Sequence, residues 1–331
     1  MSSIRRLPLQ DMALASGTRA AYAAQLRSFM EHAGISHEEL LTHSARRIDR
    51  WLSLFIQHSY DAQRPYSYAQ HALHAVVYHR QDLKLGGLLI SRQCLRGWKN
   101  KHQVKSHPPL TWELTVVIAC TLARSGYHAP AVAMLLGFDC YLRVSEITGL
   151  RRCDIVMSND ARMGRAHTGM AVCLPRSKTG LNQSVSVQNP DVATLLSHWI
   201  KSLPRTIGTT GRIFDFSPAW LGRLMRNACV SLDVGHIPYV PHSLRHGGAT
   251  ADFLRLGNVE HVHFRGRWKS IESLRTYIQQ ARALLAAVDV PEELNQLGIE
   301  LSDSVVTAVL HCMKTIPEVV PRSHGRRVTF A

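Results

Sequence analysis

The sequence predicts a mostly α-helical fold with a small antiparallel β-sheet or hairpin, divided into two domains. Its 331 residues exceed the ~100–200 residues of a typical single domain. Apolar residues recur with a period of about 3.6 residues along most of the chain and alternate only in one stretch beyond Leu150. A stiff polar segment at His107-Pro108-Pro109 marks a domain boundary. We therefore expect domains over residues 1–105 and 106–290, followed by a helical extension and basic tail over 291–331.

The N-terminal domain is predicted to be a small bundle of four helices. Within Thr18–His32 the residues Tyr22, Leu26 and Phe29 form one apolar stripe, and Gly34 can end the helix. The other predicted helices are Arg46–Ser59, Tyr66–Arg80 and Ile90–His102.

The second domain is also predicted to be largely helical. Leu114–Ser125 and Ala129–Tyr141 are apolar on nearly all faces, which indicates buried helices. Further helices are predicted over Asp191–Lys201, Pro218–Val230, Ser243–Leu256, 270–287, Glu292–Leu297 and Ser304–Lys314.

A β-hairpin interrupts these helices. Met170–Leu174 and Ser184–Val187 alternate weakly between apolar and polar residues, and the polar segment between them contains Gly180. This pattern predicts two antiparallel strands with Lys178 in their turn.

The charge of the chain indicates a polyanionic partner. The formal net charge is +15, and Lys and Arg are in excess in both predicted domains, so the charge is not one appended tail. An acidic membrane surface would be a competing partner, but two basic domains favour a protein that grips nucleic acid. On the last helix of the first domain, the residues expected to contact DNA are Arg92, Arg96, Lys99 and Lys101. For any one of them, a solvated helix face is an equally good explanation.

Several classes of protein are disfavoured by what the sequence lacks. Its seven cysteines include no C-x-x-C pair, which favours reduced thiols inside a cell. Its 19 histidines lack zinc-like spacing, so we expect no metal site. No stretch reaches about 18 uninterrupted apolar residues, and the first residues carry no signal-peptide pattern. We expect a soluble intracellular protein.

Six side chains, in order along the C-terminal two-thirds, suit the cleavage of a phosphodiester. They are Arg143, Lys178, His242, Arg245, Trp268 and Tyr277. Arginine binds phosphate through its planar fork and stays protonated, so Arg143 and Arg245 can stabilise charge that grows on the phosphate oxygens. His242 lies one helical turn before Arg245, so both can face one phosphate.

Cleavage also needs a proton donor for the leaving oxygen and a nucleophile that attacks phosphorus. Lys178, at the tip of a hairpin, can protonate the leaving 5′-oxygen as a general acid. Tyr277 can attack phosphorus and form a covalent phosphotyrosine, which conserves the bond energy for a second strand.

Each residue alone also has an ordinary explanation. An Arg and a Glu three residues apart usually form an ion pair, and a Lys before Thr-Gly is usually a turn residue. A Trp or a Tyr in a helical protein usually belongs to the core. Their occurrence together in this order, with the lysine on a hairpin and the tyrosine on a late helix, favours one shared site.

At these positions the chain resembles the tyrosine recombinases, also called the phage-integrase family. The family pattern is Arg, Lys, His-x-x-Arg, His or Trp, then Tyr. Here Arg143 lies in R-x-S-E, His242-Ser-Leu-Arg245 is followed by His246-Gly-Gly-Ala-Thr, and Trp268 stands at the His/Trp position. Glu146 is similar to the family's carboxylate that orients active-site groups, and His246 is expected beside it. The resemblance covers residues 111–287, and the N-terminal bundle looks like the family's core-binding domain without a motif of its own.

The resemblance implies a site-specific DNA recombinase or integrase. Such an enzyme cleaves through a 3′-phosphotyrosyl intermediate and exchanges strands through a Holliday junction, as a homotetramer on two double-stranded DNA sites. It implies no metal, ATP or other cofactor, no membrane and no small-molecule substrate. The protein would act beside DNA, in a eukaryotic nucleus or in a bacterial cytoplasm or nucleoid, and a mobile element is the favoured source.

Three alternatives remain. A type IB topoisomerase-like enzyme shares this active site but would give relaxed circles without recombinants. A catalytically retired DNA-binding protein could keep the same scaffold, although the intact set of six residues argues against it. A metal-dependent nuclease would need an acidic cluster, which the sequence lacks.

Overall fold

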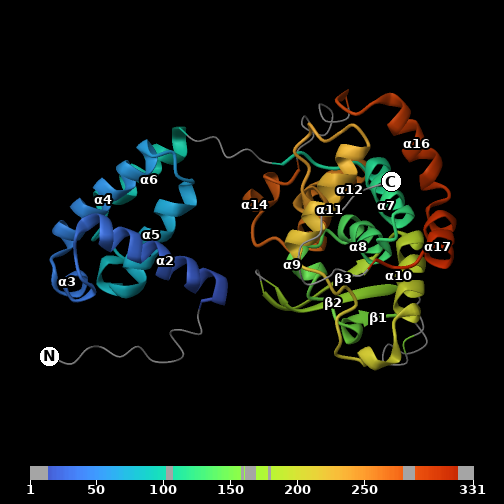
Figure 1. Cartoon of the computed structure of the whole chain (residues 1–331), viewed down its shortest axis with the longest axis horizontal. Coiled ribbons are helices and arrows are strands. Elements are labelled where there is room, and N and C mark those ends of the chain that lie inside the picture. Colours follow the sequence, from blue (N-terminus) through green and yellow to red (C-terminus); the bar gives the residue numbers. More distant parts are fainter. Residues whose placement is uncertain are drawn as a thin grey trace. The chain divides into compact units, whose positions relative to one another are not determined.

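The computed structural model describes residues 14–101, 107–157, 160, 169–177, 180–278 and 288–319, with only the backbone of 176–177 and 180–181. The chain divides into two compact units, Met1–Lys105 (unit 1) and Ser106–Ala331 (unit 2) (Figure 1). The predicted fold class, mostly helical with a small antiparallel sheet, is confirmed.

Unit 1 is a bundle of helices around one apolar core. Its elements are α2 (Ser16–Ala33), α3 (His37–Thr42), α4 (Ala45–Asp61), α5 (Tyr66–His79), η1 (Gln81–Leu83) and α6 (Leu89–Lys101). All four predicted helices are present, and their ends differ from the predicted ones by a few residues at most. The short α3 was not predicted, since a helix of 6 residues is too short to show a period. A capping box between Ser36 and Glu39 fixes its start.

One buried carboxylate ties two helices of this bundle together. Asp49, on α4, accepts hydrogen bonds from the backbone N–H groups of Ile90 and Ser91, each at 2.9 Å. The Ser91 hydroxyl donates to the same carboxylate at 2.6 Å. These bonds satisfy the first N–H groups of α6, which have no partner within the helix. Asp49 therefore fixes the start of the helix that carries the predicted DNA-contacting residues.

Unit 2 is built around α8, which is buried along almost its whole length (Figure 1). Its helices are α7 (Trp112–Arg124), α8 (His128–Asp139), α9 (Val144–Ile147), η2 (Arg152–Asp154), α10 (Pro190–Ser202), η4 (Arg205–Ile207), α11 (Pro218–Ser231), α12 (Pro241–Leu256), α13 (Val259–Gly266), α14 (Ile271–Arg275), α16 (Glu292–Ser302) and α17 (Val305–Thr315). The burial of α7 and α8 confirms the prediction made from their apolar sequences. Helices α7, α10 and α12 all pack against α8.

A glycine allows α12 to approach α8 closely. A Cβ atom on Gly248 would collide with the backbone carbonyl of Phe138 and with the ring of Tyr141. Only glycine therefore permits this distance between the two helices. The close approach brings the N-terminal half of α12, with His242 and Arg245, beside the end of α8.

The sheet has the order β1-β2-β3 and is antiparallel throughout. Its strands are β1 (Ile155–Val156), β2 (Met170–Ser177) and β3 (Gly180–Val187). Val172 pairs with Ile155 on one side and Val185 on the other, and these side chains join the main core of the unit. Ser177 pairs with Gly180, so the predicted hairpin is present. Lys178, in its turn, lies outside the described residues.

The C-terminal helices pack onto unit 2. Helices α16 and α17 both lie against α7 (Figure 1). Beyond them, Glu318 accepts hydrogen bonds from the N–H groups of His128 and Ala129, at 3.0 and 3.2 Å, and so caps the start of α8. Among the described residues, none of the helices combines the length and the apolar character needed to span a membrane.

Candidate active site

Five of the six predicted residues lie in the described part of unit 2, and the structure brings them together. Arg143 precedes α9, Trp268 follows α13, and Tyr277 follows α14. His242 and Arg245 project from α12. The sixth residue, Lys178, falls outside the described residues, so the structure does not locate it.

Tyr277 lies in an aromatic cluster formed by three elements. Its ring stacks on His246 at 4.6 Å between centroids, and it lies 4.9 Å from Trp268 and 5.4 Å from His242. The Thr250 hydroxyl donates a hydrogen bond to the Tyr277 backbone carbonyl at 3.1 Å. Helix α12 thus holds both the ring and the backbone of the tyrosine.

The local backbone at Tyr277 differs from the prediction. A continuous helical stretch was expected over 270–287, whereas α14 ends at Arg275 and Tyr277 lies in the following turn. The Tyr277 N–H still bonds to the Leu274 carbonyl at 2.7 Å. The prediction of a tyrosine within a helix is therefore wrong for this segment, because contacts with α12 outweigh helical propensity there.

Arg245 is the most deeply buried charged residue of the site, with no exposed surface. Its guanidinium lies over the Trp268 ring, with Cζ 4.4 Å from the centroid, and 5.5 Å from that of Tyr277. It donates hydrogen bonds to the backbone carbonyls of Tyr141 and Gly266. Burial, together with the neighbouring arginine side chains, lowers its pKa to about 9.

Glu146 is the carboxylate at the centre of the site. It accepts hydrogen bonds from the backbone N–H of Arg143 at 2.9 Å and from its Nη1 at 2.6 Å. It also accepts one from Nη2 of Arg267 at 3.2 Å. These contacts are of the kind that would let a carboxylate orient Arg143.

The three guanidinium groups of Arg143, Arg245 and Arg267 around Glu146 are called the arginine cluster below. Three positive charges face one negative charge, and little water reaches them. Arg143 is the most accessible of the three, with 15% of its side chain exposed. Uncompensated buried charge is costly, and an anion bound at Arg143 would reduce that cost. The cluster is thus suited to a phosphate group.

Sequence reasoning did not single out Arg267. Its only signal in the sequence was that it directly precedes a predicted site residue.

His246 is electrically neutral near pH 7. Burial, and then the nearby His242 ring, lower its pKa to about 4, against the opposing effect of a hydrogen bond with the Tyr277 backbone. A neutral imidazole stacked on the tyrosine ring adds no further positive charge to the site. It can therefore orient the tyrosine without repelling the arginine cluster.

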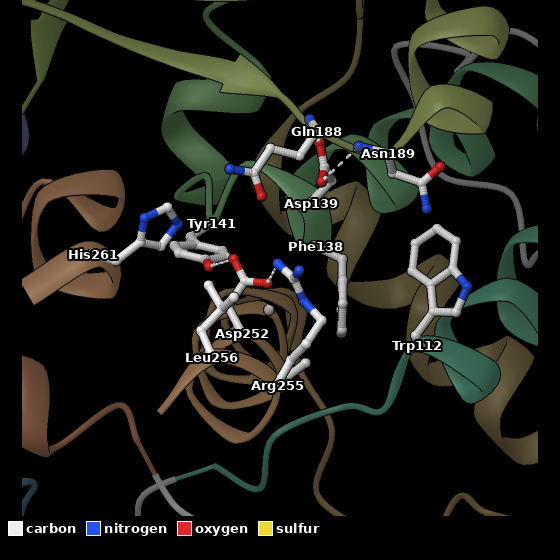
Figure 2. A pocket seen from close by; sticks show the side chains of 12 residues that line it. Trp112, Phe138, Asp139, Tyr141, Gln188, Asn189, Asp252, Arg255, Leu256 and His261 are labelled. Carbon is white, nitrogen blue, oxygen red and sulfur yellow. Dashed lines mark hydrogen bonds and ion pairs between the residues drawn. The ribbon is translucent and has the colours of Figure 1, made fainter. Parts of the chain in front are cut away.

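A separate cavity of about 650 Å³ is lined by residues that include Phe138, Asp139, Tyr141, Asp252 and Arg255 (Figure 2). The Tyr141 hydroxyl donates to Asp252, which also pairs with Arg255 at 2.7 Å. Asp139, across the cavity, accepts from the N–H groups of Gln188 and Asn189. The Tyr141 backbone carbonyl accepts from Arg245, so one residue connects the cavity wall to the arginine cluster.

The predicted DNA-contacting residues lie on α6 of unit 1. Arg96, Lys99 and Lys101 are exposed and Arg92 is half-buried, with its Nη2 donating to the Lys84 carbonyl at 3.1 Å. Leu95 and Trp98 on the same helix are buried. The helix therefore presents positive side chains outside its buried face.

No family model and no curated protein matches the sequence. Solved structures do match it. A lambda integrase (75–356) dimer bound to a COC′ core site is 12% identical, with a TM-score of 0.55 over 82% of this chain and 93% of that one. The XerH site-specific recombinase bound to its difH substrate is 13% identical, with a TM-score of 0.52 over 81% of this chain and 78% of that one. The chain thus has the fold of the tyrosine recombinases and integrases, the family that its motifs resemble.

Proposed function

We propose that this protein is a site-specific DNA recombinase that cleaves DNA with Tyr277. The observation that carries the proposal is the position of the Tyr277 ring. It is stacked on His246, lies beside Trp268 and His242, and lies directly over Arg245. A tyrosine between the neutral imidazole of His246 and surplus guanidinium charge is suited to attack a phosphodiester.

The remaining residues have separate tasks in this proposal. Arg143, the most accessible guanidinium, binds the non-bridging oxygens of the scissile phosphate. Arg245 contributes its charge from beneath Tyr277, and His242 hydrogen-bonds to the phosphate from the same helix. Trp268 packs against both Arg245 and Tyr277. Lys178 protonates the leaving 5′-oxygen, which leaves a 3′-phosphotyrosine.

Strand exchange then follows from the reversibility of this step. The hydroxyl of a second strand attacks the phosphotyrosine and releases Tyr277, which conserves the bond energy. We propose that a homotetramer on two duplexes carries out this exchange through a Holliday junction. The fold neighbours described above include recombinases bound to their DNA sites, which supports double-stranded DNA as the partner. None of these steps requires a metal or ATP.

The test is covalent capture of DNA on Tyr277. Nicked duplexes cut from the DNA on either side of the gene are mixed with the protein in excess chelator, and adducts are separated on a denaturing gel. We expect wild-type protein to form an adduct and Tyr277→Phe, which lacks only the nucleophilic oxygen, to form none. A well-folded wild type without any adduct overturns the proposal, and an adduct on the Phe variant overturns the choice of nucleophile. Recombinant products, rather than relaxed circles alone, separate this function from a topoisomerase.

A further inference from the structure

Arg267 occupies a backbone conformation that side chains rarely adopt. It ends α13 with φ 57° and ψ 40°, in the left-handed region. Glycine adopts this region freely, whereas other residues are strained in it. The backbone N–H of Arg267 bonds to the Phe264 carbonyl at the helix end, and the contacts of its side chain offset the strain.

The side chain of Arg267 is almost completely buried, with 4% of its surface exposed. Its Nη2 donates to Glu146 Oε2 at 3.2 Å and to the Tyr141 carbonyl at 3.4 Å. Its Nε and Nη1 are buried and have no hydrogen-bond partner among the described residues. Because these two atoms are also closed off from solvent, Arg267 does not reach a DNA phosphate directly.

Glu146 is therefore shared between two arginines. Its Oε1 accepts from Arg143 Nη1 at 2.6 Å, while Oε2 accepts from Arg267 and from the Arg143 backbone. With Arg143 alone, the buried carboxylate would neutralise the guanidinium that faces outward. A second cation on the same carboxylate leaves Arg143 with net positive charge to offer a phosphate.

We propose that Arg267 is a positioning residue for DNA cleavage. It holds Glu146 from the side opposite Arg143, so that Glu146 orients the Arg143 guanidinium without cancelling its charge. This inference rests on the proposed function, since it gives Arg143 a phosphate to bind. Arg267 itself acts only through Glu146.

The decisive variant is Arg267→Gly. Glycine suits the left-handed backbone, so the turn that leads into Trp268 is kept while the guanidinium is lost. We expect the rate of covalent adduct formation to fall about 100-fold, the scale of loss seen when a catalytic group is misplaced. Arg267→Lys, which keeps a cation near Glu146, is expected to recover part of that rate. Asp233→Gly, which places glycine at another left-handed position of unit 2 (φ 58°), is the matched control and should cleave at the wild-type rate.

Two further measurements distinguish positioning from other roles. In a Tyr277→Phe background, Arg267→Gly should leave the Kd for the same DNA unchanged, because Arg267 does not touch it. In a Glu146→Gln background, Arg267→Gly should lower the rate of adduct formation by a further factor of less than about three, because the two residues act as one unit. The inference that Arg267 acts through Glu146 would be overturned by weaker DNA binding. It would also be overturned if the rate loss of the double variant equalled the product of the two single losses.

The outcomes separate this inference from the proposed function. If wild-type protein forms the adduct and Arg267→Gly forms it equally fast, the inference fails and the proposed function stands. If wild-type protein forms no adduct, the proposed function fails and the inference fails with it. If Arg267→Gly does not fold, Arg267→Lys decides. A loss of about tenfold at an unchanged melting temperature supports positioning, whereas a wild-type rate, or a loss that follows lower stability, overturns it.

Discussion

Asp49 in unit 1 and the arginine cluster in unit 2 are both buried groups of charge, but their surroundings differ. The Asp49 carboxylate receives two backbone N–H groups and one hydroxyl at 2.6–2.9 Å. All of these donors are neutral and belong to the start of one helix. Through these hydrogen bonds the Asp49 carboxylate joins α4 to α6, and it has no capacity left to bind a ligand.

The arginine cluster has the opposite balance. Three guanidinium groups lie around the single carboxylate of Glu146, which accepts hydrogen bonds from Arg143 and Arg267. Nε atoms on both Arg245 and Arg267 are buried without a hydrogen-bond partner among the described residues. Surplus charge of this kind is unfavourable in the free protein and is relieved when an anion binds. A saturated buried charge thus indicates a structural role, whereas an unsaturated one indicates a binding site.

Removing the saturated charge tests the first half of this contrast. Asp49→Ala leaves the first N–H groups of α6 without partners, so we expect the free energy of unfolding of unit 1 to fall by about 3 kcal/mol. Urea denaturation followed by circular dichroism measures the loss, and hydrogen exchange of the α6 amides localises it to unit 1.

The matched control is Asp61→Ala on the same helix. Asp61 is exposed and accepts one hydrogen bond, from Gln57 at 2.9 Å, so its removal should cost less than about 0.5 kcal/mol. Equal losses for the two variants would show that saturation of Asp49 does not matter for stability.

Adding charge beside the arginine cluster tests the second half. His246 has a pKa of about 4 in the folded protein and about 6.5 when unfolded. Between these values the unfolded chain binds a proton that the native protein does not, so stability falls as the pH falls from about 6.5 to 4. We expect a loss of about 2 kcal/mol between pH 7 and pH 5 from this one group.

Urea unfolding of wild type and His246→Gln at the two pH values isolates the effect, since the variant lacks the titrating ring. His198→Gln, at an exposed position on α10, should keep the wild-type dependence on pH. A His246→Gln variant with the same pH dependence as wild type would show that the site tolerates additional positive charge.

The sequence predicted correctly those features of the fold that depend on local sequence pattern. The four helices of unit 1, the buried α7 and α8 and the hairpin followed from periodicity, and the order of the site residues followed from motif. Tyr277 was assigned to a helix because its neighbours favour one, yet a hydrogen bond from Thr250 and the stack on His246 hold it in a turn. Such contacts join residues that are far apart in sequence, so periodicity does not reveal them.

The role of Arg267 was hidden for a related reason. A single sequence does not distinguish an exposed arginine in a turn from one folded inward onto a carboxylate more than a hundred residues earlier. Only the left-handed backbone and the contact with Glu146 reveal the difference. In the same way, sequence indicated that Asp49 lies on a helix but not that it caps another one.

The smallest expected effect concerns positive charge that is exposed rather than buried. Arg96 and Lys99 lie three residues apart on α6 with their side chains in solvent, so salt screens them, unlike the arginine cluster. If both bind DNA phosphates, changing either one to Ala should lower the slope of log K against log salt by about 1 and weaken binding by roughly 1 kcal/mol at low salt. Filter binding of the Tyr277→Phe protein over a salt series measures both quantities.

The control for net charge alone is Arg50→Ala, which removes an exposed arginine on α4. An equal change in slope for this control would mean that α6 acts through general charge and makes no specific phosphate contacts. The cleavage rate of bound DNA should be unaffected by any of these substitutions, because the residues lie outside the unit that contains Tyr277.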